Sequence, residues 1–186
     1  MKEDLDLYEE DQEKVEEILI SLLGVVDSPL PSLTHAEKEI FILCKSNPEI
    51  QKYFEFEEHY YGAYSQVLEE TLDEPLFYED AFQIEKDGIH LTRQGKKLYN
   101  EILDKYKDNE EFKVLLIALK LIREVYDKLS TEELIFLLYF TYPECGKYSN
   151  VYERLIGDKQ KRKNLTNNLY RKGIITERRY EELLAI

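Results

Sequence analysis

The sequence predicts a mainly α-helical protein with one small β-hairpin, and three observations support this fold class. Apolar residues recur at helical spacing along most of the 186-residue chain. Ser/Thr-x-x-Glu capping boxes at residues 34–37 and 130–133 each mark the start of such a segment. Residues 82–92 instead alternate apolar and polar side chains around an Asp-Gly step, which is the strongest short-range signal of a hairpin.

Three helices are expected before the hairpin, at about residues 11–23, 34–46 and 66–74. The first places Val15, Ile18 and Leu22 on one apolar stripe. Thr34 would cap the second helix and Ser65 the third, because both residue types favour the position before a helix. A short extended piece and an aromatic turn are expected between the second and third helices.

The hairpin is expected to turn at residues 87–88, because a two-residue turn of this kind needs positive φ at both positions. Ile84 would then pair with Leu91. One face of the hairpin would hold the apolar residues Phe82, Ile84, Ile89 and Leu91. Thr92 would cap the helix that follows. A helix, a hairpin and a second helix in this order predict a winged-helix-like domain over residues 1–106.

Residues 107–186 are expected to form a second, helical domain. A helix over about residues 109–128 carries apolar side chains almost all round, which is typical of a central or interface helix. Ser130 opens another apolar helix through its capping box. Helices over residues 158–172 and from Thr176 onward complete the prediction.

Cysteine usage and hydropathy predict a cytoplasmic protein. Cys44 and Cys145 stand apart, with no CxxC pair, which favours a reducing compartment and argues against a zinc site or a disulfide framework. The longest apolar runs, around residues 114–119 and 134–140, are much shorter than the roughly 18–20 residues that a membrane span needs.

The net charge of −14 is unevenly distributed. Residues 1–86 hold 23 acids and 6 bases, whereas residues 87–186 hold 16 acids and 19 bases. Such an asymmetry favours self-association or an interaction tail, and we expect a homodimer.

The acidic half argues against DNA reading by the winged-helix-like domain. Residues 53–85 contain ten acids and no Lys or Arg. The helix at 66–74, which would enter the major groove, carries the acids Glu69, Glu70, Asp73 and Glu74. Duplex binding draws most of its affinity from Lys and Arg that neutralise phosphates, so this helix has the wrong sign.

Two quoted stretches carry a resemblance to a family. Phe54-Glu-Phe-Glu-Glu-His-Tyr-Tyr-Gly-Ala-Tyr-Ser65, and Leu91-Thr-Arg-Gln-Gly-Lys-Lys-Leu98 after the hairpin, resemble the YwgA-type and SocA-like (Panacea) small prokaryotic proteins over about residues 11–106. Those proteins carry a Tyr-Gly-Pro-[Tyr/Phe]-Ser-like turn, in which Ala63 here replaces Pro. The resemblance implies a non-enzymatic regulatory module, because members of the SocA-like group act as antitoxins or adaptors that bind a partner protein.

The aromatic turn is the candidate protein-binding site. It consists of Tyr60, Tyr61, Gly62, Tyr64 and Ser65. Aromatic residues at a turn supply contact area at low entropic cost and are enriched at interfaces. The alternative interpretation is that they pack the third helix onto the core.

The basic region lies near the C-terminus, where residues 158–180 hold eight bases and two acids. At helical spacing one face carries Lys159, Lys163, Asn167 and Arg171, which are suitable for phosphate and base-edge contacts. This stripe is alternatively a solvated face, or it neutralises the acidic half of its own or a neighbouring chain. Residues 172–184 also resemble the small SHOCT helical module, which implies at most an association role.

No catalytic, cofactor-binding or metal-binding residues are predicted. His90 is expected opposite Glu85 on the exposed face of the hairpin, and Cys44 lies on an apolar helical stripe. The predicted function is therefore non-enzymatic protein binding of antitoxin or adaptor type. The alternative is a DNA-binding regulator that uses the basic stripe and dimerises through residues 112–126.

Overall fold

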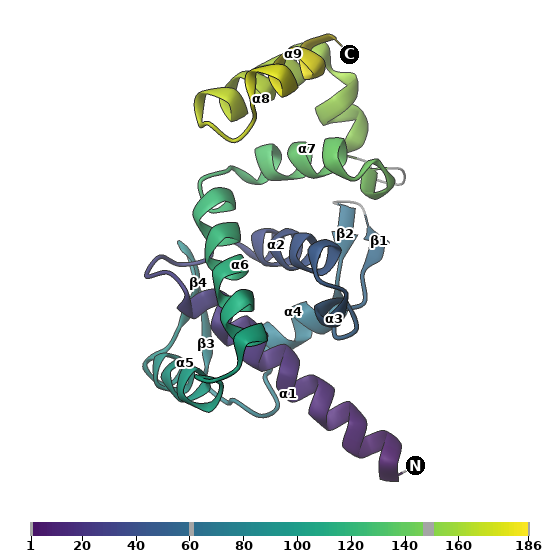
Figure 1. Ribbon diagram of the computed structural model, residues 1–186. Helices are drawn as coiled ribbons and strands as arrows, with labels where there is room; N and C mark the ends of the chain where they lie inside the picture. Colours follow the sequence, from purple (N-terminus) through teal and green to yellow (C-terminus); the bar gives the residue numbers. More distant parts are fainter. Residues whose placement is uncertain (1, 60–61, 147–150, 186) are drawn as a thin grey trace. The chain divides into compact units, whose positions relative to one another are not determined.

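The computed structural model describes residues 2–59, 62–146 and 151–185, and it confirms a mainly helical protein with a small antiparallel β-hairpin at residues 82–91 (Figure 1). A second antiparallel strand pair, at residues 57–59 and 62–64, adds to the predicted fold. The chain forms two compact units. Unit 1 comprises Met1–Phe56 with Ser65–Glu124, and unit 2 comprises Glu57–Tyr64 with Val125–Ile186. This division differs from the expected boundary after residue 106, because the long central helix groups with unit 1 and the first hairpin groups with unit 2.

Unit 1 contains six helices among the described residues and one hairpin. Their bounds are α1 (Lys2–Gly24), α2 (Leu33–Ser46), α3 (Pro48–Gln51), α4 (Gln66–Asp73), β3 (Phe82–Glu85), β4 (Gly88–Leu91), α5 (Arg93–Lys105) and α6 (Glu110–Tyr126, of which the last two residues group with unit 2). Helix α1 packs against α4, α5 and β4. Leu30, between α1 and α2, pairs with Ile89 of β4 through N–O distances of 3.0 and 2.8 Å. The order helix, extended residue, helices, hairpin and helix is compatible with a winged-helix-like shape.

The register of the β3–β4 hairpin corrects the prediction. Ile84 pairs with Ile89, not Leu91, and the turn residues are Lys86 and Asp87. Gly88, with φ +141°, is the first residue of β4, and its backbone lies directly against the carbonyl of Leu30. The tertiary pairing with Leu30 therefore holds β4 in a register two residues away from the one that the turn pattern predicts, and the turn itself lies one position earlier in the chain.

Helix caps account for most of the helix starts. Thr92 accepts a hydrogen bond from the Gly95 amide (3.0 Å), and Ser130 forms the predicted capping box with Glu133. The prediction for α2 was wrong, because Ser32, not Thr34, accepts the hydrogen bond from the backbone of the first turn. Ser32 has extended backbone geometry, whereas Thr34 already lies inside the helix.

The sequence predicts a central or an interface helix for α6, and the structure buries only one of its faces. Leu115, Leu119 and Ile122 are buried, but Val114, Ile117 and Leu121 are 64%, 61% and 56% exposed. The buried face also holds Arg123, which is fully buried. Its guanidinium donates hydrogen bonds to the carbonyls of Leu22 (2.7 Å) and Ser28 (2.8 Å), so one side chain fixes α6 to the end of α1 and the loop after it.

Unit 2 is a small helical bundle that carries the other hairpin. Its elements are β1 (Glu57–His59), β2 (Gly62–Tyr64), α7 (Thr131–Thr141), the 3-10 turn η1 (Pro143–Gly146), the π-helical turn η2 (Glu153–Gly157), α8 (Lys159–Arg171) and α9 (Glu177–Ala185). Its core contains Phe136, Leu155, Leu169 and Leu183. None of the described helices is long and apolar enough to cross a membrane.

Candidate functional site

The net charge of the protein resides in unit 1. Unit 1 holds 28 acids and 14 bases, whereas unit 2 holds 11 of each. Within unit 1 the exposed carboxylates concentrate on α4 and the loop and strand that follow it. The exposed acids of this segment, here called the acidic face, are Glu69, Glu70, Asp73, Glu74, Glu79, Asp80 and Glu85. The acidic face therefore includes α4, the helix that the sequence predicts would face the major groove if the domain bound DNA as a winged helix does.

Two large apolar side chains emerge from the middle of the acidic face. Leu76 is 63% exposed and Phe77 is 42% exposed. Both lie in the loop of residues 74–81 that joins α4 to β3, just after Pro75. Exposed side chains of this size, surrounded by charged groups, are typical of contact surfaces.

A buried carboxylate holds this loop in place. Glu16 of α1 is fully buried, and it accepts hydrogen bonds from three consecutive backbone amides. The shortest distances are 2.7 Å from Leu76 N, 3.0 Å from Phe77 N and 2.8 Å from Tyr78 N. Successive amides that converge on one anion form a concave nest, and here the chain fills the nest with its own side chain. The loop is therefore fixed at its start.

The far end of the loop is fixed by the start of α5. The Thr92 hydroxyl donates a hydrogen bond to the Asp80 carbonyl, and the Thr92 amide donates to the Ala81 carbonyl (3.0 Å). Asp80 has φ +58°, a left-handed conformation that Asp tolerates better than most residues. Gly95 is required here, because any side chain at this position would collide with the Ala81 carbonyl.

A charged network anchors the same part of α1 to α5. The Glu17 carboxylate accepts hydrogen bonds from Lys105 Nζ (2.6 Å), Lys14 Nζ (2.7 Å) and the Tyr106 hydroxyl (2.8 Å). Burial by itself would raise the pKa of Glu17, but these three donors outweigh it and lower the pKa below its ordinary value of 4.5. The Tyr78 hydroxyl donates to Glu13 (3.0 Å), and burial raises the pKa of Tyr78.

A hollow of about 330 Å³ lies between α1 and α4, next to Leu76. Its lining combines the carboxylates of Glu70, Asp73 and Glu74 with the apolar side chains of Val67 and Leu76. This combination matches a side chain that has an apolar stem and a cationic head.

The predicted protein-binding turn is buried as far as the structure describes it. Tyr60 and Tyr61 lie outside the described residues. Gly62 and Ser65 are buried, and Tyr64 is half-buried. A Cβ at Gly62 would lie 3.2 Å from the ring of Tyr139, so β2 packs closely on α7 within unit 2. The described residues of the turn therefore contribute to packing and offer little free surface.

The basic stripe on α8 is exposed where Lys159, Lys163 and Arg171 lie, and Leu165 and Leu169 of the same helix are buried. Within the described part of the chain, neither Lys159 nor Lys163 forms an ion pair. Asn167 is already engaged, because its side-chain oxygen accepts a hydrogen bond from the Tyr180 hydroxyl (2.8 Å).

Other cations of the C-terminal region stabilise unit 2 itself. Lys172 donates to Glu133 (2.6 Å) and to the Lys128 carbonyl (2.7 Å), and Lys161 pairs with Glu132. These contacts tie both ends of α8 to the start of α7. Part of the local positive charge is therefore used for packing, a role that the sequence could not separate from a binding role.

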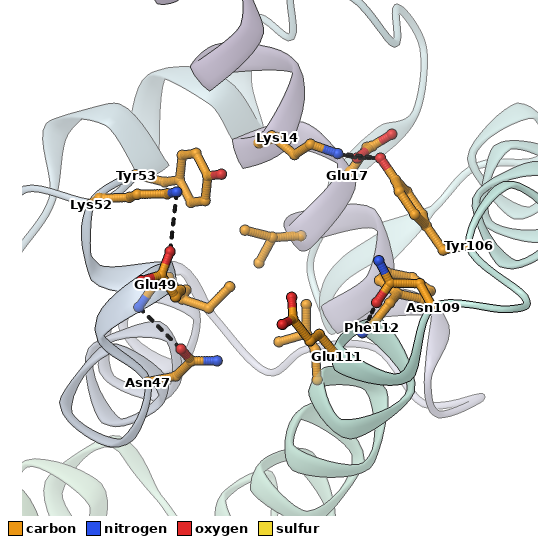
Figure 2. A pocket seen from close by; sticks show the side chains of 13 residues that line it. Lys14, Glu17, Asn47, Glu49, Lys52, Tyr53, Tyr106, Asn109, Glu111 and Phe112 are labelled. Carbon is orange, nitrogen blue, oxygen red and sulfur yellow. Dashed lines mark hydrogen bonds and ion pairs between the residues drawn. The ribbon is translucent and has the colours of Figure 1, made fainter.

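A second pocket, of about 240 Å³, opens between α1, α3 and α6 (Figure 2). Figure 2 shows Lys14, Glu17 and Tyr106 at one side, and Lys52 beside Glu49 (3.3 Å) at the other. The pocket is smaller than the roughly 300–1,000 Å³ of most small-molecule sites. In this pocket Lys14 forms an ion pair with Glu17, and Lys52 forms one with Glu49.

The structure places Cys44 in the core and His90 on the β3–β4 hairpin. Cys44 is buried, and burial raises its pKa from 9.0 to about 12, which suppresses the thiolate at neutral pH. His90 pairs across the hairpin with Gln83, not with the expected Glu85. Its ring lies 3.0 Å from Asp87 and forms with Asp87 and Glu85 a cluster spaced closely enough for a metal ion. That cluster lies on the surface, where acidic groups of this kind are common without an ion.

Comparison of the chain with protein-family models, with curated proteins and with solved structures found no match. The resemblance to the YwgA-type and SocA-like proteins therefore stays a prediction, and the interpretation of function rests on the geometry of the acidic face.

Proposed function

We propose that this protein is a non-enzymatic regulatory module of antitoxin or adaptor type, and that it acts by binding another protein through the acidic face. The observation that carries this proposal is the sign of charge on α4. Glu70 and Asp73 are exposed on α4 and Glu74 directly after it, and the cations nearest to this segment along the sequence, Lys52 and Lys86, lie outside residues 53–85. Carboxylates repel nucleic-acid phosphates and attract Lys and Arg, so a polypeptide is the ligand that this surface favours.

The aromatic turn has a different role in this proposal from the one expected. Because Gly62 and Ser65 are buried, we assign them to packing and place the contact on α4 and the following loop. In this proposal the protein is cytoplasmic and homodimeric, and the exposed side chains Val114, Ile117 and Leu121 of α6 supply apolar area for the dimer.

Affinity capture from an extract of the native host tests the main proposal. The full chain is immobilised as wild type, as the double variant Glu70→Lys/Asp73→Lys, and as the control Asp104→Lys/Asp108→Lys. The control makes the same change in net charge at exposed positions of unit 1 outside the acidic face. A protein that wild type and control retain, and that Glu70→Lys/Asp73→Lys loses, supports the proposal. Equal retention by all three chains contradicts it.

A DNA-binding regulator is the second candidate, favoured by the exposed Lys159 and Lys163 on α8. A gel-shift titration with random duplex at low salt tests it. If α8 binds DNA, the chain retains duplex and loses it with Lys163→Glu/Arg171→Glu, and retention falls steeply as salt rises. The main proposal expects no retention at any salt concentration.

A further inference from the structure

We infer that Leu76 and Phe77 are the apolar anchors of the acidic face, and that its occupant is a cationic amphipathic segment of the partner protein, with a large apolar side chain flanked by Lys or Arg. This inference rests on the proposed function and specifies the chemistry of the partner. The inference combines two observations: Leu76 and Phe77 are exposed on a loop held at both ends, and carboxylates surround them.

The anchors are held before any partner arrives. Glu16 fixes the amides of residues 76–78, and the start of α5 fixes Asp80 and Ala81. A loop held at both ends loses little conformational entropy on binding, so a larger share of the contact energy appears as affinity. The exposure of Leu76 and Phe77 is therefore a fixed feature of the loop and not the result of a flexible tip turning outward.

The surrounding charge selects the partner. Carboxylates precede the anchors on α4 and follow them at Glu79 and Asp80. Asp73, Glu74 and Glu79 form no ion pair within the described residues, so their charge is available to a ligand. The hollow beside Leu76 presents an apolar wall and three carboxylates, which suits a Lys or Arg side chain that enters next to the buried apolar anchor.

The same charges disfavour two other occupants of an exposed apolar pair. The cytoplasmic face of a membrane is anionic and would be repelled by the flanking carboxylates. Duplex DNA would be repelled for the same reason. A second copy of the chain is the remaining competitor, because Lys159 and Lys163 on α8 have the required sign.

Three fluorescent synthetic helical peptides serve as probes for fluorescence anisotropy at fixed ionic strength. The first combines Lys on one face with Leu on the other, the second replaces Leu with Ser, and the third replaces Lys with Glu. The inference expects the Lys/Leu peptide to bind at least about tenfold more tightly than the Lys/Ser peptide, and the Glu/Leu peptide not to bind. Equal affinity for the Lys/Leu and Glu/Leu peptides would overturn it.

Variants of the full chain locate the contact. Leu76→Ser/Phe77→Ser should reduce the affinity for the Lys/Leu peptide by at least about tenfold and leave the affinity for the Lys/Ser peptide unchanged. Leu184→Ser, which removes an exposed apolar side chain from α9, outside both the acidic face and α6, is the control and should change neither affinity. Circular dichroism verifies that both variants fold. A loss that is equal in both variants would place the contact elsewhere and refute the inference.

Two further readouts separate the possible failures. Sedimentation of the chain alone at low salt reports self-association, and a dimer that Leu76→Ser/Phe77→Ser abolishes would make a second copy the occupant and overturn the inference. In the extract experiment, a partner lost by Glu70→Lys/Asp73→Lys but retained by Leu76→Ser/Phe77→Ser would overturn the anchors and leave the proposed function standing. If no partner depends on the acidic face, both proposals fall.

Discussion

Replacement of Glu16 by Gln removes the charge that holds the loop after α4. The carboxylate accepts hydrogen bonds from three backbone amides, at 2.7 to 3.0 Å, and is fully buried. The Gln side chain keeps a single acceptor oxygen and turns an NH2 group toward amides that are themselves donors. A hydrogen bond to a charged group contributes about 1.5–3 kcal/mol, but water can reach the exposed loop and offset part of the loss. We therefore expect Glu16→Gln to reduce the free energy of unfolding by about 2–4 kcal/mol.

Urea unfolding followed by circular dichroism measures this change, and amide hydrogen exchange at Leu76, Phe77 and Tyr78 locates it. Glu10→Gln is the matched control, since Glu10 lies exposed on the same helix. It should change the stability by less than about 0.5 kcal/mol. If Glu16→Gln matches this control and the three amides keep their protection, the loop is not held by Glu16, and the entropic argument for Leu76 and Phe77 fails with it.

Three further predictions concern other parts of unit 1 and the α8 cap. Lys105 and the other donors hold Glu17 ionised, so its pKa in the folded protein lies below the ordinary 4.5. The contribution of Glu17 to the free energy of unfolding is therefore complete above pH 4.5 and is lost as the pH falls through the folded pKa. The stability difference between wild type and Glu17→Gln, measured by urea unfolding, should shrink below pH 4.5; a difference that stays constant would contradict this. The rise in the pKa of Cys44 from 9.0 to about 12 lowers the fraction of thiolate at neutral pH about a thousandfold. Iodoacetamide should therefore label Cys44 at least about a hundredfold more slowly in the native chain than in urea. Comparable labelling rates in the two conditions would refute this. Gly88→Ala introduces a Cβ at φ +141° against the Leu30 carbonyl and should cost about 2–4 kcal/mol in urea unfolding. Gly173→Ala is the control, because Gly173 has φ +70° but no other heavy atom lies within 4 Å of the added Cβ; this substitution should lower the free energy of unfolding by about 1–2 kcal/mol. Equal losses of stability at Gly88 and Gly173 would exclude a clash between the Cβ at position 88 and the Leu30 carbonyl.

Local signals in the sequence predicted local structure well. Thr92 and Ser130 cap their helices as expected, because a cap binds amides only two or three residues away. The Asp-Gly step correctly predicted a hairpin at residues 82–91 but not its register. Leu30, more than fifty residues earlier, pairs with Ile89, and no local pattern contains that contact.

The charge of the candidate site was predictable from the sequence, whereas the exposure of its side chains was not. The negative charge of the acidic face, for example at Glu70, Asp73 and Glu74, is evident from the sequence, because exposed acids are negatively charged whatever the fold. No local pattern predicts that Leu76 and Phe77 are exposed, or that Gly62 and Ser65 of the aromatic turn are buried, because burial depends on partners from other elements.

The sequence by itself determined which segments become helices, where most of them begin, and that α4 cannot neutralise phosphates. Those properties depend on hydrogen bonds within one turn and on the charge of each side chain. Only the tertiary structure decided that Glu16 holds residues 76–78 and that Arg123 is buried against the carbonyls of Leu22 and Ser28. The hydrogen-bond partners of a buried charge are backbone groups that are distant in sequence and are brought together by packing, so local sequence patterns do not predict them.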